Sequence, residues 1–291
     1  MTSPLSFNDL EKKINSLIFD DYFYTRNIKL KTTNSSDIDW TAAGTLSPSG
    51  TIGEVSAVYL NPNGFSLENF KIKTDGRVMA EASLKFTESL KFNASIEDGR
   101  QEPGKPLRSF GILGMNFQST SGNIAIQGDV DVVNGPTFYG SSVLKYNDCF
   151  KFGMETRYNT HYEEKQDTAP ELMDLNFGGA YMCPDWTFSA RTTDLLENIR
   201  LSYVHNVAPD LDVGALVDYR VKSNHQSLAI ATRWMPDQQT VVKGKVDSDA
   251  IFSASFRQRL SKFLQLTFCA EVDGKEMGAE GHKFGIGLEF E

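Results

Sequence analysis

Histidine and cysteine, the residue types used most often for metal binding and nucleophilic catalysis, are few and scattered in this sequence. No two of the four histidines stand at metal-ligand spacing; they are His161, His205, His225 and His282. The three cysteines are isolated and form no C-x-x-C pair, so we interpret them as small apolar packing residues. They are Cys149, Cys183 and Cys269.

The nearest approach to a catalytic cluster is His161 with Glu163 and Glu164. These residues lie in the polar stretch 159–171, where a solvated run of charges explains them better than a site does. Gly285-Ile286-Gly287 is no nucleotide fingerprint, because no helix can follow it, and neither G-x-S-x-G nor a Walker A motif occurs. We therefore predict a protein that is not an enzyme and that uses no cofactor and no metal.

Charge and hydropathy narrow the class further. The 291-residue chain has a formal net charge of −9, which argues against a nucleic-acid partner, since such proteins present a basic surface. The sequence contains no run of about 18 apolar residues, which a transmembrane helix would need, and residues 1–19 lack the features of a secretory signal peptide. A membrane β-barrel stays open, because its strands give only a weak signal one by one.

One amphipathic helix is predicted, over residues 6–19. Phe7, Leu10, Ile14, Leu17 and Ile18 form its apolar stripe, and Ser6 is a suitable N-cap. The polar residues, Glu11 among them, are expected to face away from this stripe; they are Asp9, Glu11, Lys12, Lys13 and Asn15.

After the helix, apolar and polar residues alternate in short runs separated by turn residues, which is typical of β-strands. The closing residues 281–290 show the pattern to the end of the chain, with Phe284, Ile286, Leu288 and Phe290 on one face. We predict an all-β fold of about nineteen strands in one domain, residues 26–291, after an N-terminal segment, residues 1–25. The strands are placed near 26–32, 38–46, 51–60, 64–73, 77–86, 89–97, 107–117, 121–132, 136–147, 149–158, 172–182, 186–193, 196–205, 210–221, 225–234, 240–247, 249–258, 263–272 and 281–290.

Strand number bears on the direction in which the apolar face points. A barrel of about eight strands fills its interior with side chains, whereas sixteen or more strands leave an aqueous channel. A nineteen-strand barrel would therefore turn its apolar face to lipid and line its lumen with polar residues. A soluble sandwich of two packed sheets would hide the same apolar face, so the pattern alone leaves both folds open.

The two ends of the chain resemble the mitochondrial porins, the family of voltage-dependent anion channels. The similarity lies in "PLSFNDLEKKINSLIF" followed by "IKLKT", in Gly135-Pro136, in "KVDSDAIFSASFRQRLSKFLQLTFCAEVDGKEM" and in the closing "GHKFGIGLEFE". The resemblance implies a nineteen-stranded barrel in the mitochondrial outer membrane, with parallel first and last strands and the helix inside the pore. It also implies voltage dependence, a lipid environment, and passage of ions and small metabolites including ATP and ADP. Lys283, Gly285, Leu288 and Phe290 match the family's C-terminal sorting signal.

Several positions depart from the family pattern. The segment "DDYFYT", residues 20–25, has no glycine where the family has a glycine-rich hinge between helix and barrel. Two basic helix positions of the family fall on Asn15 and Asp20, whereas Lys12 matches and Lys13 is an addition. An acidic lipid-facing position of some members falls on Phe70.

The polar faces of the predicted strands carry a small excess of basic side chains, which predicts a weakly anion-preferring pore with acidic mouths. Lys12 and Lys13 are the helix residues expected to meet anionic solutes, and the basic wall positions are Lys29, Lys31, Lys85, Lys91, Lys145, Arg191, Arg220, Lys243, Lys245 and Arg257. Two other functions remain open, a protein-translocase barrel and a structural or docking barrel with little conductance. A homo-oligomer is also left open.

Overall fold

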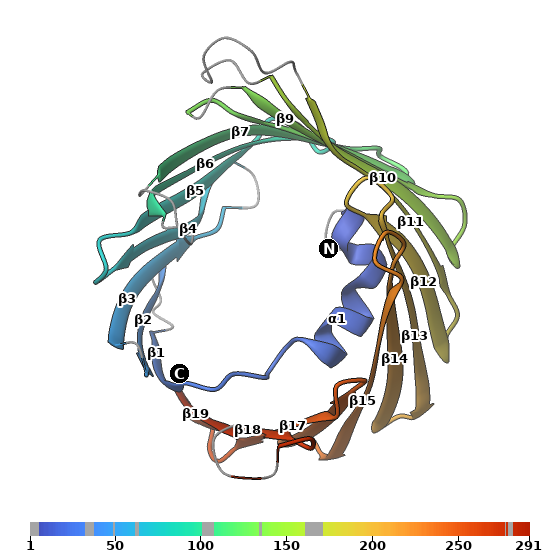
Figure 1. The fold of residues 1–291 in the computed structure, drawn as a ribbon. Coiled ribbons are helices and arrows are strands. Elements are labelled where there is room, and N and C mark those ends of the chain that lie inside the picture. Colours follow the sequence, from blue (N-terminus) through green and yellow to red (C-terminus); the bar gives the residue numbers. More distant parts are fainter. Residues whose placement is uncertain are drawn as a thin grey trace.

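The structure is a computed structural model that describes residues 6–32, 38–48, 50–61, 64–100, 108–133, 136–160, 171–276, 278 and 282–291. The cluster considered above, His161 with Glu163 and Glu164, and Gly135 of the family motif lie outside these residues. A ring of strands encloses one helix, and the segment after the helix runs along the inside of the wall to the seam between the first and last strands (Figure 1).

The predicted helix is present and begins with a tighter turn. A 3₁₀ helix, η1, spans Phe7–Glu11 and continues into α1, Lys12–Ile18. Ser6 and Asp9 form a capping box: the Asn8 backbone N–H donates to Ser6 Oγ over 3.3 Å, and the Ser6 N–H donates to the Asp9 carboxylate over 2.8 Å. Among the described residues, no helix combines the length and the apolar character needed to cross a membrane.

Nineteen strands follow, and their number and order confirm the prediction. Each strand pairs antiparallel with the next, while β1 pairs parallel with β19, with Arg26 opposite Ile286 and Leu30 opposite Phe290. This pairing closes the sheet and rules out the two-sheet sandwich, because none of the described strands is left at an edge. The strands are β1 Arg26–Thr32, β2 Ile38–Ser47, β3 Gly50–Tyr59, β4 Phe65–Lys73, β5 Val78–Lys85, β6 Leu90–Arg100, β7 Arg108–Gln118, β8 Ile124–Asp131, β9 Thr137–Lys145, β10 Phe150–Asn159, β11 Glu171–Met182, β12 Trp186–Thr193, β13 Asn198–Ala208, β14 Leu211–Arg220, β15 His225–Asp237, β16 Thr240–Asp247, β17 Ile251–Arg259, β18 Leu264–Asp273 and β19 Lys283–Phe290.

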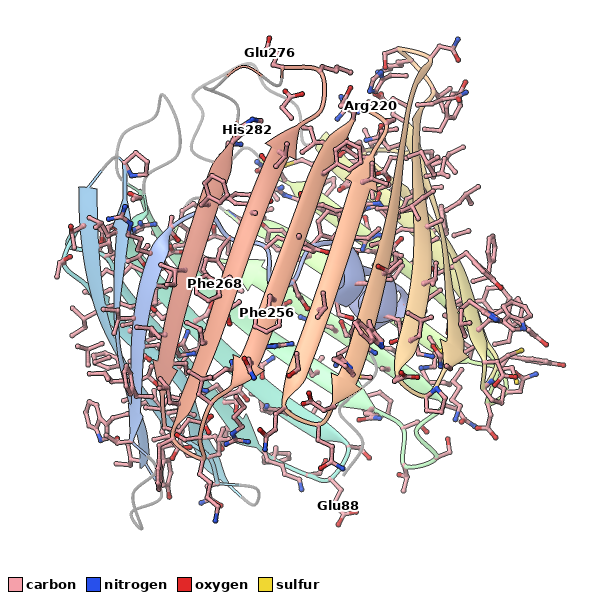
Figure 2. The ribbon with its side chains drawn as sticks, turned by 90° about the horizontal axis from the view of Figure 1, so that it is seen from below. Glu88, Arg220, Phe256, Phe268, Glu276 and His282 are labelled. Atoms are coloured by element: carbon pink, nitrogen blue, oxygen red, sulfur yellow. The ribbon has the colours of Figure 1, made fainter. Side chains whose placement is uncertain are left out.

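The alternating pattern separates an apolar outer face from a polar lumen. On the outside, Ile28, Leu113 and Phe252 are each more than half exposed, and Phe256 and Phe268 lie on the outer surface of β17 and β18 (Figure 2). So much exposed apolar surface is what a lipid-facing wall requires. Side chains of the opposite parity point inward, where some of them meet the helix.

A β-bulge in β4 interrupts the alternation. Between β4 and β5 the register shifts between Leu67 and Asn69, so that both Ser66 and Asn69 pair with lumen-facing residues of β5. The extra residue, Glu68, also turns inward and accepts a hydrogen bond from Ser83 over 2.9 Å. A bulge adds one residue to one strand only, so the lumen-facing residues of β4 have even numbers before it and odd numbers after it.

Candidate functional site: the lumen and its N-terminal segment

The helix packs its apolar stripe against small and apolar side chains of the barrel wall. Phe7 and Leu10 form one buried cluster with Val143 and Ala180 of β9 and β11. Further along, the second cluster joins three helix residues to three wall residues, namely Ile14, Leu17 and Ile18 with Val204, Leu216 and Ala231. Because each of these side chains is at most 5% exposed, the helix is docked against the wall and does not float in the lumen.

Glycines in the wall make room for this packing. A Cβ atom at Gly153 would lie 2.6 Å from Phe7 Cδ2, and one at Gly214 would lie 2.6 Å from Leu17 Cδ2. Carbon atoms do not approach so closely, so any larger residue at either position would push the helix away. Glycines at these two wall positions therefore leave the space that Phe7 and Leu17 occupy.

Glu11 is a correction to the sequence analysis, which placed it on the face turned away from the stripe. It is only 1% exposed, and its carboxylate lies 3.7 Å from an Arg191 nitrogen and 3.9 Å from an Arg200 nitrogen. Helical spacing explains this, because Glu11 follows Phe7 by four residues and precedes Ile14 by three, so all three share one face. Burial raises the pKa of Glu11, while Arg200 and then Arg191 oppose that rise.

The segment between helix and barrel is anchored at Asp21. Its carboxylate forms ion pairs with Lys243 over 2.5 Å and with Arg257 over 3.0 Å. The Lys243 ammonium, whose side chain is 4% exposed, also donates to the Ser16 carbonyl over 2.8 Å. Beneath the segment, the buried Cys269 thiol donates to the Asp21 carbonyl over 2.9 Å. A positive φ of 69° at Asp21 lets the backbone turn in a segment that contains no glycine.

Aromatic side chains continue the anchoring as far as β1. Phe23 lies on Gly285 and Gly287 of β19, where a Cβ atom at Gly287 would come within 2.8 Å of the Phe23 ring and one at Gly285 would clash with the Phe23 carbonyl. The Lys245 ammonium lies 4.7 Å above the Tyr22 ring, and the Tyr24 hydroxyl lies 3.3 Å from Ser253 Oγ. Burial raises the pKa of the Tyr24 hydroxyl to about 12. Residues 20–25 therefore form a fixed strut along the wall.

The helix residues predicted to meet solutes differ in their surroundings. Lys12 is 72% exposed and lies 3.9 Å from Asp9, whereas Lys13 donates to Thr187 Oγ1 over 3.1 Å. Both line a cavity of about 720 Å³ between helix and wall, which Lys145 and Lys151 also line. Asn15 is half-buried, and the exposed Asp20 accepts a hydrogen bond at its carbonyl from Lys243 over 3.4 Å.

Most of the basic wall residues have an acidic neighbour. Arg191, Lys243 and Arg257 pair with the N-terminal segment as described above, Lys29 and Lys31 pair with Glu289, Lys91 pairs with Glu68, and Lys145 pairs with Asp148. Lys85 forms no ion pair with any described residue and lies directly opposite Lys91. Arg220 ends β14 at the rim of the barrel (Figure 2). Most of the basic wall residues therefore have an acidic partner, and a few have none among the described residues.

Sequence analysis missed a charged group near the start of the barrel. Glu54 of β3 lies 3.7 Å from Lys71 and 3.9 Å from Lys73 of β4, all on the lumen face. Lys71 and Lys73 alternate with Phe70 and Ile72, but the bulge a few residues earlier breaks the alternation of β4, and Glu54 lies in no clearly alternating run.

Nothing in the described part of the chain resembles an active site. No group of three or more histidine, cysteine, aspartate or glutamate side chains there could hold a metal ion. The three cysteines, all within that part, are free thiols. A charged aqueous lumen with a docked helix is therefore the candidate functional site, and its chemistry is electrostatic.

This combination of a closed membrane-type barrel, an apolar outer face and a helix docked inside a charged lumen defines a channel-forming class of protein. Residues 3–285 match the eukaryotic porin family, and the chain belongs to that family. It is 27% identical over 298 residues to the "Voltage-dependent anion-selective channel" of Drosophila melanogaster, covering 99% of both chains. It is 24% identical over 296 residues to the "Mitochondrial outer membrane protein porin" of Candida albicans, again covering 99% of each. With the "Non-selective voltage-gated ion channel VDAC3" of Rattus norvegicus it shares 26% identity over 300 residues and the full length of both chains.

Proposed function

We propose that this protein is a channel of the mitochondrial outer membrane through which ions and small metabolites diffuse passively. The observation that carries the proposal is the one-sided position of the helix. The helix packs along β9–β11 and β13–β15, which leaves the facing wall, β2–β8, open to the lumen (Figure 1). A barrel of nineteen strands is wide enough to keep an aqueous path beside the helix. The names of the porin relatives, which include an outer-membrane porin and voltage-dependent channels, support it.

Weak anion preference is part of the proposal. Lys12, Lys13, Lys145 and Lys151 line one cavity beside the helix, where they face two acidic residues, Asp9 and Asp148. Phosphate-bearing solutes such as ATP and ADP carry the charge that such a group of ammonium ions attracts. The wall cations paired with Glu11 and Asp21 contribute less, because carboxylates of the N-terminal segment balance them.

Reconstitution in a planar bilayer tests the channel and its selectivity together. We expect stepwise conductance and, in a salt gradient, a reversal potential of the sign given by anion preference. Lys12→Gln combined with Lys145→Gln should reduce that potential, while Lys222→Gln, in an exposed turn, should not. Absence of conductance would refute the channel, and a reversal potential that favours cations would refute the anion preference.

Voltage dependence, carried over from the relatives' names, forms part of the same proposal. The ion pairs of Asp21 and the contacts of Phe23 hold the N-terminal segment on the wall. We therefore assign any voltage-driven change to the barrel or its rims and not to release of the helix.

The alternative barrels are less well supported. A translocase barrel is disfavoured by the match to porins along the whole chain. A docking barrel with little conductance gains some support from the fixed strut, and the bilayer recording distinguishes it. A homo-oligomer stays a prediction that contacts within one chain do not address.

We also propose that Lys283, Gly285, Leu288 and Phe290 act as the sorting signal for membrane insertion. The structure adds a second constraint on one of these residues, because Gly285 lies under the Phe23 carbonyl. Import into isolated mitochondria separates the two roles. Loss of insertion in Phe290→Ser, with insertion retained in Phe23→Ala, is expected, and normal insertion of Phe290→Ser would refute the signal.

A further inference from the structure

The two ends of the lumen differ in charge. All odd-numbered strands run the same way, so they end at one rim, which we call the C-terminal rim; the even-numbered strands end at the opposite rim. The turn that holds Glu88 lies at the C-terminal rim, and Arg220, Glu276 and His282 lie at the opposite rim (Figure 2). Directly paired residues of neighbouring strands point to the same face of the sheet. The position of a residue along its strand then gives the rim that it lies nearer to.

Lysines stand in opposed pairs at the C-terminal rim. Lys85 at the end of β5 is directly opposite Lys91 at the start of β6, and Lys145 at the end of β9 is directly opposite Lys151 of β10. Like charges that face each other across two strands repel, so each pair raises the local positive potential. Lys91 and Lys145 have acidic partners, whereas Lys85 and Lys151 form no ion pair with any described residue.

Carboxylates lie at the other end of the same sector of wall. Asp129 and Asp131 end β8 and Asp174 lies near the start of β11, while Glu155 lies in the middle of β10. Asp129 accepts a hydrogen bond from the Gln127 amide over 2.6 Å, and Asp174 accepts one from the Leu195 N–H over 3.3 Å. These donors are neutral and leave the negative charge in place. Arg157, opposite Asp174, and Arg191, 3.7 Å from Glu155, weaken the negative potential beside them, whereas Asp129 forms no ion pair with any described residue.

We infer that the wall from β5 to β11 makes the lumen bipolar, with an anion-admitting C-terminal rim and a cation-admitting opposite rim, and that the channel therefore rectifies. The inference rests on the proposed channel function. When the compartment at the opposite rim is positive, cations enter past the carboxylates while anions enter past the lysines, and both accumulate in the lumen. Reversed polarity draws both out and lowers the conductance.

Salt concentration sets the size of this effect. The Debye length is about 30 Å at 0.01 M salt, comparable to the hydrocarbon thickness of a bilayer, and about 3 Å at 1 M, where wall charges act only on adjacent ions. We expect currents at equal and opposite voltages to differ by about 1.5-fold at about 0.01 M KCl and to be equal at about 1 M.

The test is a single-channel current–voltage curve recorded from channels of known orientation. Cys149, Cys183 and Cys269 are replaced by serine, and Thr87→Cys in the turn at the C-terminal rim is biotinylated. Streptavidin added to one compartment then reports which rim faces it. Larger current with the opposite rim positive is expected, and either a symmetric curve or the reverse polarity overturns the inference.

Charge variants test whether the rectification arises from the lysines at one rim and the carboxylates at the other. Lys85→Gln with Lys145→Gln should bring the current ratio close to one, and so should Asp129→Asn with Asp174→Asn. Lys222→Gln with Lys275→Gln removes the same charge from exposed turns at the opposite rim, outside the β5–β11 sector, and should not lower the ratio. An equal loss of rectification in this control overturns the inference, as does a retained ratio in both lumen variants. The wild-type curve decides the matter if a variant fails to insert, and a wild-type chain without any conductance refutes the channel function itself.

Discussion

The wall that carries the N-terminal segment and the wall that faces it are built from the same alternating strands but use their inward positions differently. Under the apolar stripe of the helix many inward residues are small or apolar, among them Ala180, Val204 and Leu216, and none of these three is more than 5% exposed. On the open wall, β2–β8, they are mostly polar, as with Ser83, Asn93 and Gln127. One side of the barrel thus serves as a receptor for the helix and strut, and the other lines the path for solutes.

The largest effect is expected at the Asp21 anchor. Asp21→Asn keeps a residue that tolerates the left-handed backbone but leaves the buried Lys243 ammonium without its carboxylate, which costs about 3 kcal/mol. The strut should then detach more often, and labelling of Cys269 by a thiol reagent should quicken about 100-fold in a Cys149→Ser, Cys183→Ser background.

The open wall supplies the matched control. Glu54→Gln also removes a carboxylate with two cationic neighbours, but neither Lys71 nor Lys73 is buried as Lys243 is, so a cost below about 1 kcal/mol is expected. Labelling of Cys269 should stay at the wild-type rate. Equal acceleration by both variants would mean that the anchor is no stronger than an ordinary lumen ion pair.

A glycine substitution should have an intermediate effect. Gly285→Ala would place a methyl group against the Phe23 carbonyl, and overpacking of this kind costs about 2 kcal/mol. Faster labelling of Cys269 is again the expected readout. Gly44→Ala on β2, where nothing lies within 4 Å of the added atom, should change nothing, and a normal labelling rate in Gly285→Ala would contradict the fixed strut.

The smallest effect is expected from pH and concerns Glu11. Because burial raises the pKa of Glu11 in the docked helix, the docked state holds the proton more tightly than an undocked one. This contribution to docking is fully present below the ordinary pKa of glutamate and is lost as pH rises through the raised pKa. Lowering pH from about 7 to about 5 should therefore slow hydrogen exchange of the helix amides, corrected for intrinsic rates. Glu11→Gln should abolish the change, and faster corrected exchange at the lower pH would contradict it.

The barrel could be predicted from the sequence because its main signals are local. Alternation and turn residues give the strands, and the number of strands turns the apolar face outward. β1 was predicted with the bounds found, Arg26–Thr32, and the helix was predicted to within a residue at either end. The β4 bulge was not predictable in this way, since one extra residue leaves the composition of the strand unchanged.

The wall that binds the helix could have been recognised in the sequence from apolar residues at inward-facing positions. Leu216 is a large apolar residue within the polar set of its strand, and the structure places it beneath Leu17 and Ile18. Val143 breaks the pattern in the same way beneath Phe7 and Leu10. The Asp21 anchor left no such signal, because its partners Lys243 and Arg257 lie more than 200 residues away along the chain and meet it only when the barrel closes.

The division between a receptor wall and an open wall can be measured with two isosteric variants. Ser189→Cys lies under the helix, where the serine is 1% exposed, and Ser95→Cys lies at mid-height on β6 and faces the open lumen. In a background without other cysteines, an anionic methanethiosulfonate reagent is applied to channels in a bilayer and the change of conductance is followed. Reaction at Ser95→Cys that is at least about 100-fold faster than at Ser189→Cys is predicted, since reaching Ser189 requires the helix to undock at a cost of about 3 kcal/mol. Equal rates at the two positions would show that the helix leaves its wall freely and would contradict the account.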